Sequence, residues 1–284
     1  MSISYATLPE IILEPMIRNA LAEDLGQYGD ITTRAVIPPD LTYEARLNAR
    51  ETGIVSGMQV AALTFRLVDP TLDIFTHISD GNACQSGDTL MTIKGNAASI
   101  FMGERVALNL AGRLSGIATL TAAFVSNTIG TKTRITCTRK TTPGLRMVEK
   151  QAVLHGGGFN HRFGLSDAIL IKDNHIAAAG GISAVLDRAR AVASHMVCIE
   201  IEVDNLEQLE EVLNSKIADA VLLDNMDTPT LKQAVNMVGG NLVTEASGNM
   251  KLERIPEVAG AGVDYISSGA LTHSVKTLDL GLDF

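Results

Sequence analysis

Residues 198–225 read CIEIEVDNLEQLEEVLNSKIADAVLLDN, and this stretch decides the fold. It joins an apolar β-rich run, an amphipathic helical pattern and a second apolar run, and each run ends in charged or polar residues. Asp204 or Asn205 can cap the helical part LEQLEEVL. A strand, a helix and a strand in this order predict a βαβ unit of a parallel sheet.

The same rhythm continues on both sides of this stretch. Thr228 followed by Pro229 supplies an N-cap and a first-turn proline for another helix, and a further helix starts near Ser183. The pattern places six strands and leaves a seventh unplaced, so we expect an α/β barrel with fewer than the usual eight strands. The six expected strands are Arg134–Thr138, Ala168–Ile171, Cys198–Val203, Ala220–Leu223, Leu242–Glu245 and Val263–Ser267.

The first hundred or so residues follow a different pattern. Short segments at 45–57, 72–78 and 88–95 are separated by Gly, Asp and Asn turns, which is typical of the antiparallel sheet of a small α+β domain. We expect a helix at Glu10–Leu25 before them and a longer helix at Glu104–Gly130 after them. These patterns put a soft boundary near residues 110–130, and we predict an N-terminal domain at 1–115 and a barrel at 116–270. We also expect the C-terminal segment 271–284 to join the N-terminal domain.

Composition and cysteine usage limit the class of protein. The chain has 284 residues, 46% of them hydrophobic, which is enough for a large core. Its cysteines, Cys84, Cys137 and Cys198, are far apart and lack C-x-x-C spacing, so neither a disulfide framework nor a zinc site is indicated. The first residues do not resemble a targeting segment, and we see no apolar run of membrane-spanning length. We expect a soluble cytoplasmic protein.

The charge pattern points to an anion site. Residues 132–172 contain eight Lys or Arg against two acids, although the whole chain has a net charge of −9. A local cationic site on an acidic chain favours a small, multiply charged anion over a nucleic acid, whose backbone needs an extended basic face. Aromatic residues make up only 4% of the chain, which also argues against stacking of bases. We expect a carboxylate ligand, a phosphate ligand, or both.

Chemically reactive side chains follow the expected strands. In a parallel α/β barrel, functional groups collect at the C-terminal ends of the strands. These positions supply cations for ligand anions, carboxylates for a divalent metal and Gly-flanked amides for phosphate. The residues at these ends are Arg139, Lys140, Lys172, Asp173, His175, Glu202, Asp224, Glu245, Ser247, Gly248, Asn249, Ser268 and Gly269.

Each element also has a purely structural interpretation. Lys172 and Asp173 can form a strand-end ion pair, and the glycines at 156–158 match no phosphate-binding motif and read equally well as a turn. His161 and Arg162 can simply be solvated. Glu202 is the strongest single residue, because strand alternation puts it on the same face as Glu200, where an unpaired carboxylate is costly.

Ten sequence motifs extend this interpretation over nearly the whole chain. In their wording and their order along the chain they resemble the motifs of the quinolinate phosphoribosyltransferases. The matching stretches are EDLGQYGDITT (23–33), RETGIVSG (50–57), ERVALNLAGRLSGIAT (104–119), TRKTTPGLR (138–146), GGGFNHRFGL (156–165), IKDNHI (171–176), IEIEVDNLEQL (199–209), LLDNM (222–226), EASGN (245–249) and SSGALTHSVKTLDLGL (267–282). The resemblance implies an N-terminal α/β sandwich domain and an incomplete, seven-stranded α/β barrel. It also implies a dimer or larger assembly, in which Arg105 is lent across the interface to the partner's active site.

The resemblance further implies roles for individual residues. The implied catalytic set is Lys140, Lys172, Glu202 and Asp224, of which Glu202 and Asp224 would bind the ribose hydroxyls and Mg²⁺, with no organic cofactor. The implied substrate-binding residues are Arg105, Thr138, Arg139, His161, Arg162 and His175 around quinolinate and the adjoining site, and Ser247, Gly248, Asn249, Gly269 and Ala270 at the sugar-phosphate end. The implied reaction joins the pyridine nitrogen of quinolinate to C1 of phosphoribosyl pyrophosphate, releases pyrophosphate and then loses CO₂.

One position departs from the family pattern, and other readings remain open. Where the family commonly has Asp-Thr-Arg-Lys, this chain has Cys137-Thr138-Arg139-Lys140, so a carboxylate beside the anion site is lost. We interpret Cys137 as a neutral replacement. The alternatives are a paralogous, molybdenum-locus phosphoribosyltransferase with another substrate, an aldolase or lyase that forms a Schiff base at Lys172, and a non-catalytic sensor of pyridine dicarboxylates.

Overall fold

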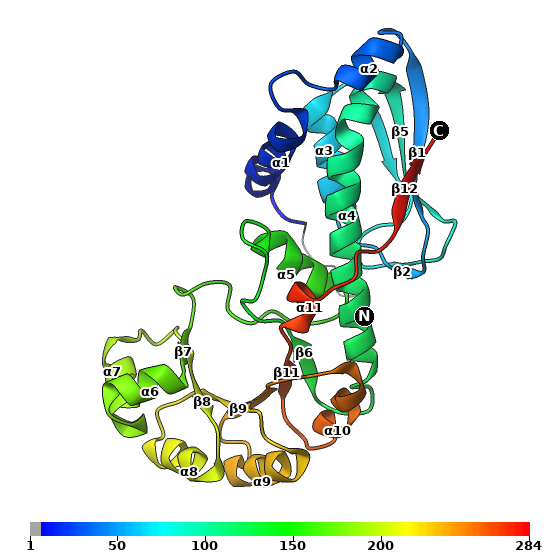
Figure 1. Cartoon of the computed structure of the whole chain (residues 1–284). Coiled ribbons are helices and arrows are strands. Elements are labelled where there is room, and N and C mark those ends of the chain that lie inside the picture. Colours follow the sequence, from blue (N-terminus) through cyan, green and yellow to red (C-terminus); the bar gives the residue numbers. More distant parts are fainter. Residues whose placement is uncertain (1–6) are drawn as a thin grey trace. The chain divides into compact units, whose positions relative to one another are not determined.

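The computed structural model describes residues 7–284, which divide into two compact units (Figure 1). The first unit comprises the described residues up to Ala122, together with Thr142–Gly157 and Ser274–Phe284. The second unit comprises Ala123–Thr141 and Gly158–His273. The expectation that the chain starts without a targeting segment concerns in part residues 1–6, which lie outside the described part.

An antiparallel sheet forms the centre of the first unit. Its strands are β1 (Thr42–Ala49), β3 (Asp73–Thr76), β5 (Thr89–Asn96) and β12 (Leu280–Asp283), in the order β12-β1-β5-β3. A second small sheet pairs β2 (Gly53–Ile54) with β4 (Ala83–Cys84). The expected antiparallel pattern of the N-terminal part is confirmed. The last strand, β12, pairs with β1, so the end of the chain belongs to this sheet.

Five helices belong to the first unit: α1 (Glu10–Leu25), α2 (Ile31–Val36), α3 (Met58–Val68), α4 (Ala97–Ser126, whose last turn belongs to the second unit) and α5 (Arg146–His155). The predicted bounds of α1 are confirmed. The long helix starts earlier than predicted, because the Asn96 side chain accepts a hydrogen bond from the Ser99 amide and so caps it. It also ends earlier than Gly130, where Asn127 and Thr128 donate to carbonyls of its last turn.

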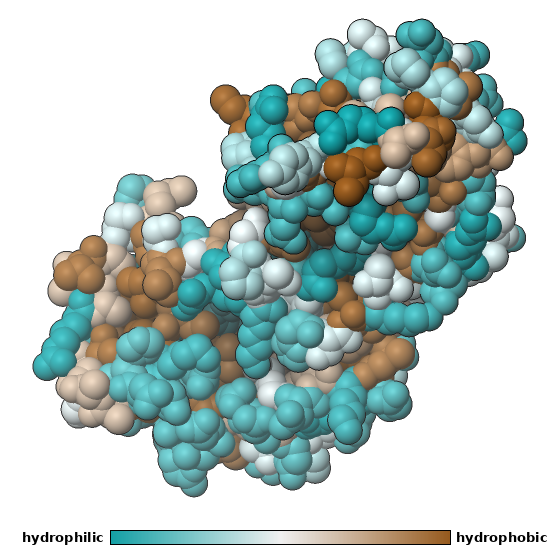
Figure 2. Space-filling view, turned by 45° about the horizontal axis from the view of Figure 1, so that its top comes forward, coloured by the Kyte–Doolittle hydropathy of each residue, from teal (hydrophilic) through white to brown (hydrophobic). Residues whose placement is uncertain are grey.

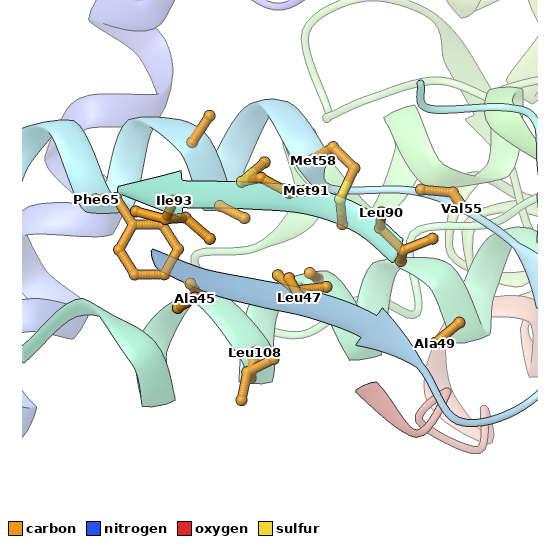
Figure 3. Packing of buried hydrophobic residues seen from close by; sticks show 14 of the residues in the cluster. Ala45, Leu47, Ala49, Val55, Met58, Phe65, Leu90, Met91, Ile93 and Leu108 are labelled. Carbon is orange, nitrogen blue, oxygen red and sulfur yellow. The ribbon is translucent and has the colours of Figure 1, made fainter. Parts of the chain in front are cut away.

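The core of the first unit lies between its sheet and two helices (Figure 3). Alternate residues of β1, namely Ala45, Leu47 and Ala49, point to one face and are fully buried. Met58 and Phe65 of α3 pack in the same cluster, as do residues of β5 and α4. The strand period of two and the helical period together build one continuous apolar layer.

Helix α4 corrects one expectation from the sequence. Its 30 residues are, by length and composition, long and apolar enough to cross a membrane, although we expected no such run. However, 61% of its most apolar window is buried inside the protein. We therefore describe α4 as a core helix. Hydrophilic side chains cover much of the surface in Figure 2, and apolar side chains lie among them in separate patches.

A parallel sheet forms the centre of the second unit (Figure 1). Within the described residues its strands are β6 (Arg134–Thr136), β7 (Ile169–Ile171), β8 (Ile199–Val203), β9 (Ala220–Asp224), β10 (Val243–Ser247) and β11 (Tyr265–Ser267), in the order β6-β11-β10-β9-β8-β7. All six predicted strands are confirmed within a few residues. An isolated parallel bridge joins Thr136 to Phe159 beside β6, at the edge where a seventh strand would lie. The incomplete α/β barrel is therefore confirmed as the fold class.

Helices alternate with these strands: α6 (Asp173–Ala179), α7 (Ile182–Val192), α8 (Leu206–Ser215), α9 (Thr228–Val238), the 3₁₀ helix η1 (Leu252–Arg254), α10 (Ile255–Ala259) and α11 (Ala270–His273). Asn205 caps α8 by accepting from the Gln208 amide at 2.9 Å, as one of the two predicted caps. The predicted cap Thr228 was wrong. Asp227 accepts from the Thr230 amide at 2.9 Å and caps α9, and its ionised carboxylate is favoured over a hydroxyl at a helix N-terminus.

Candidate active site

The ends of the parallel strands bring most of the predicted site residues to one edge of the second unit. Because all strand pairs of this sheet are parallel, their C-terminal ends lie on the same side. Thr138, Arg139 and Lys140 follow β6, Lys172 follows β7, and Ser247 ends β10. This edge therefore gathers side chains that are far apart in the sequence.

Lys172 pairs with an acid from the neighbouring strand. Its Nζ lies 2.9 Å from Oε2 of Glu202, while Asp173 accepts a hydrogen bond from the Asn174 amide. The pairing of Lys172 with Asp173 that the sequence allowed is therefore not the one that forms. His175 accepts a hydrogen bond from the Lys172 amide through Nδ1 at 2.9 Å, so it fixes the start of α6 beside this pair.

Asp224 lies at the end of the next strand, in a partly buried acidic environment. Burial raises the pKa of its carboxyl group, repulsion from Asp204 adds to this shift, and Lys172 and Lys140 act in the opposite direction. The Asn225 side-chain amide donates to Asp224 at 2.5 Å. Because Asp204 and Asp224 repel each other, a cation bound near these two carboxylates is electrostatically favourable.

The loop after β10 approaches Asn225 closely. Gly248 has φ +95°, and a β-carbon at this position would lie 2.1 Å from Oδ1 of Asn225. Only glycine therefore fits here without displacement. Asn249 also has a positive φ and reaches Asn225 with its side-chain amide at 3.5 Å. The chain thus makes a tight, glycine-dependent turn after β10, and turns of this kind can present backbone amides to an anion.

Lys140 is placed by residues after β11. The Lys140 carbonyl accepts a hydrogen bond from the Thr272 hydroxyl at 2.7 Å, and its amide donates to Oγ1 of Thr138 at 3.0 Å. A β-carbon on Gly269 would lie 2.7 Å from Cδ of Lys140. Ala270 then starts α11. Glycine at 269 therefore leaves room for the lysine stem.

Two arginines lie near each other without an acidic partner. In the described part of the chain, neither Arg139 nor Arg162 forms an ion pair within 4 Å, and Nε of each is buried without a hydrogen-bond partner. Burial lowers the pKa of Arg162 and repulsion from Arg139 lowers it further, while the more distant carboxylates of Asp167 and Glu200 act in the opposite direction. One N–H of Arg162 donates to the Ala168 carbonyl at 3.0 Å. Two neighbouring cations in this state favour a ligand that carries negative charge.

His161, which precedes Arg162 in the chain, forms a cluster with the buried Glu200 and Glu245. Nε2 of His161 lies 2.9 Å from Glu200 and 3.6 Å from Glu245. Burial and repulsion from Glu200 raise the pKa of Glu245 to about 7. Glu200 and Glu202 alternate along β8, as predicted, and each has a cationic or imidazole partner.

Cys137 lies at the end of β6, where the family pattern has an acid. It is fully buried, and its thiol donates to Oδ1 of Asn160 at 3.2 Å. The glycines at 156–158 follow α5 and include Gly157 at φ +83°, so they form a turn at a helix end. The structural reading of these glycines is sufficient.

Some residues of the candidate active site were not predicted from the sequence. Glu245 was noted at a strand end but given no role, and Asn225 was not considered. The sequence did offer a signal for Asn225, which follows Asp224 directly at a strand end. Asn readily adopts a positive φ in a turn, and Asn225 has a φ of 53°. Arg105 belongs to the first unit, where its side chain is 63% exposed beside Glu104.

Comparisons with family models and with curated proteins show what this chain is similar to. Residues 30–115 match the model of the quinolinate phosphoribosyl transferase N-terminal domain, and residues 117–283 match that of the C-terminal domain. A Bacillus subtilis (strain 168) protein named probable nicotinate-nucleotide pyrophosphorylase (carboxylating) is 44% identical over 95% of this chain and 93% of its own. The chloroplastic nicotinate-nucleotide pyrophosphorylase (carboxylating) of Arabidopsis thaliana is 42% identical over 99% of this chain and 85% of its own.

A solved structure shows the same fold. The nicotinate-nucleotide pyrophosphorylase from Francisella tularensis superposes with a TM-score of 0.92 and 39% identity, covering 97% of both chains. Both family models lie in the expected order and together cover most of the chain. The chain therefore belongs to the quinolinate phosphoribosyltransferase family.

Proposed function

We propose that this enzyme transfers the phosphoribosyl group of phosphoribosyl pyrophosphate to quinolinate and decarboxylates the product, giving nicotinate mononucleotide, pyrophosphate and CO₂. The observation that carries the proposal is the pair Arg139 and Arg162, two neighbouring guanidinium groups with buried, unpartnered Nε atoms and no acidic partner among the described residues. A dicarboxylate supplies the missing charge, and arginine binds carboxylates through paired hydrogen bonds. Family membership supports the same substrates.

The site residues divide into two groups in this proposal. Arg139, Arg162, Lys172 and His175 surround quinolinate, with His161 beside them, and Thr138 holds the Lys140 amide. Lys140 lies between the two substrates. The second group receives the phosphoribosyl pyrophosphate: Glu202 and Asp224 at the ribose hydroxyls, and Ser247, Gly248, Asn249, Gly269 and Ala270 at the phosphate.

The reaction then needs positioning and charge more than acid-base chemistry. The pyridine nitrogen attacks C1 of the ribose as the C1–O bond to pyrophosphate breaks, and Lys140 stabilises the negative charge that builds up on the leaving group. In the second step the bond from C2 to the carboxylate breaks, and its electron pair stays at C2, next to the cationic ring nitrogen. A proton from solvent replaces CO₂. No general base is assigned.

The carboxylates fit a magnesium ion, which prefers oxygen ligands and completes its shell with phosphate and water. Burial and the neighbouring Asp204 raise the pKa of Asp224, so a cation near it relieves unfavourable charge. Glu202 and Asp224 would hold the ion. When bound, it would neutralise pyrophosphate charge. No organic cofactor is part of the proposal.

The proposal includes a homodimer in the cytoplasm. Each subunit contributes an arginine across the interface to the active site of its partner. Arg105 supports this assignment, because the ion pair that its exposed side chain forms with the described residues is a 3.8 Å contact with the adjacent Glu104. The test mixes Arg105→Ala subunits with Lys140→Ala subunits. Activity restored in the hybrids supports the shared site. Absence of activity despite proven subunit exchange contradicts it.

The direct test incubates the purified protein with quinolinate, phosphoribosyl pyrophosphate and magnesium, and measures pyrophosphate and nicotinate mononucleotide. Nicotinate replaces quinolinate as the control. Both products from quinolinate alone, and their loss after chelation with EDTA, are the expected result. Turnover of nicotinate, or none with either acid, contradicts the assignment and favours a phosphoribosyltransferase with another substrate.

A further inference from the structure

The cluster of His161, Glu200 and Glu245 occupies a buried position on the second unit. The side chains come from the loop before β7, from β8 and from β10, and Glu200 and Glu245 are only 8% and 5% exposed. One possible ligand atom from each of the three residues lies within 4.8 Å of the other two, which is a spacing that metal ligands also have. The hydrogen bonds of the imidazole decide between a metal site and a positioning network.

The backbone of Arg162 fixes the tautomer of His161. The Arg162 amide donates to Nδ1 of His161 at 2.8 Å, so Nδ1 is the accepting nitrogen. The ring proton then resides on Nε2 and faces Glu200 at 2.9 Å. A metal ion at Nε2 would need the lone pair of a nitrogen that carries this proton. The network therefore favours hydrogen bonding over metal ligation.

Both ring nitrogens of His161 are consequently engaged within the protein. Nε2 is held by the glutamates, and Nδ1 holds the Arg162 amide. Arg162 itself is fixed at its far end by the Ala168 carbonyl at 3.0 Å. At this far end its guanidinium group stays near Arg139, against a repulsion between like charges that Asp167 and Glu200 only partly offset. Without the imidazole anchor, that repulsion would favour separation of the two cations.

We infer that Glu200 and Glu245 are positioning residues that act through His161 to hold Arg162 in place for a carboxylate group of the substrate. The inference rests on the proposed function only for the identity of the substrate. It changes the role expected of His161, which then holds Arg162 and does not bind quinolinate through a ring nitrogen. A misplaced guanidinium group weakens binding even though no substrate contact has been removed.

The first arm of the test measures kinetics. Glu200→Ala removes the acceptor of the Nε2 proton, and we expect KM for quinolinate to rise by about 10-fold or more while KM for phosphoribosyl pyrophosphate stays within about twofold. Glu200→Gln keeps an acceptor oxygen and should restore most of the affinity. Thr244→Val is the matched control, because Thr244 is buried next to Glu245 in β10 but donates to Asp264 instead. Equal KM effects in Glu200→Ala and Thr244→Val would overturn the inference.

The second arm needs no turnover. Phenylglyoxal modifies accessible arginines, and mass spectrometry of the peptide that contains Arg162 gives its rate of modification in the whole protein. We expect Glu200→Ala to increase this rate several-fold over wild type, and Thr244→Val to leave it unchanged. An unchanged rate in Glu200→Ala contradicts the inference. Wild-type protein that fails to turn over quinolinate contradicts the proposed function instead, and the modification rates still test the positioning.

Discussion

Nζ of Lys172 lies 2.9 Å from Oε2 of Glu202, across the ends of the adjacent parallel strands β7 and β8. The side chain of Lys172 is 50% exposed and that of Glu202 11% exposed, so the lysine reaches the site from the rim and the acid lies deeper. A half-exposed pair of this kind contributes little to stability. It holds a cation and a carboxylate beside each other in the proposed active site.

Loss of Lys172 should therefore reduce activity much more than stability. We expect Lys172→Ala to lower kcat/KM by roughly 10²- to 10³-fold, with a thermal midpoint close to wild type. Lys132→Ala is the matched control, since Lys132 forms a similar exposed pair with Asp264 at 2.7 Å near the start of β6. Steady-state assays and thermal unfolding of both variants check this. A similar loss of activity in both would show that the position of Lys172 is not special.

Gly248 should not tolerate a side chain. In Gly248→Ala the new β-carbon would meet Oδ1 of Asn225 at 2.1 Å, so the loop after β10 must move. We expect weaker binding of phosphoribosyl pyrophosphate, by about 10-fold or more, and a destabilised second unit. Gly240→Ala is the control, because Gly240 has a similar positive φ of 82° but open space around it. If the two variants behave alike, backbone strain explains the effect and the contact with Asn225 does not.

Glu245 should make stability depend on pH. Its pKa is raised from 4.5 to about 7, so between these values the folded protein binds a proton that the unfolded chain has released. The free energy of unfolding of the wild type should therefore fall, relative to Glu245→Gln, as pH rises through this window, and the difference should level off above it. Urea unfolding of both proteins at several pH values measures this. Parallel curves would mean that Glu245 does not titrate in the window.

Cys137 should be replaceable by the acid of the family pattern without a large change in chemistry. The thiol is buried and donates to Oδ1 of Asn160, whose amide group can turn to donate to a carboxylate. We expect Cys137→Asp to lower stability, because a charge is buried, while kcat/KM of the folded enzyme stays within about fivefold. Cys137→Ser serves as the neutral comparison. A much larger change in kcat/KM for Cys137→Asp alone would refute the interpretation of a neutral replacement.

The sequence by itself determined the elements whose signals are local. The six strands, a helix N-terminus at Asp204 or Asn205 and the reactive residues at strand ends follow from periodicity and short-range hydrogen bonding, which depend only on neighbouring residues. The parallel βα rhythm also determined that these residues meet at one edge of the second unit, because that consequence is topological.

Tertiary structure alone decided which side chains become partners. Lys172 pairs with Glu202 from the next strand and not with its neighbour Asp173, and His161 meets Glu200 and Glu245 from two other strands. The sequence led us to expect the C-terminal segment in the N-terminal domain, but only the structure gives β1 as the partner of β12, across most of the chain length. These contacts depend on the register of the strands, which sets the side chains that become neighbours. A buried charge is costly without a partner, so it pairs with a group that the packing brings near, however distant that group is in the sequence.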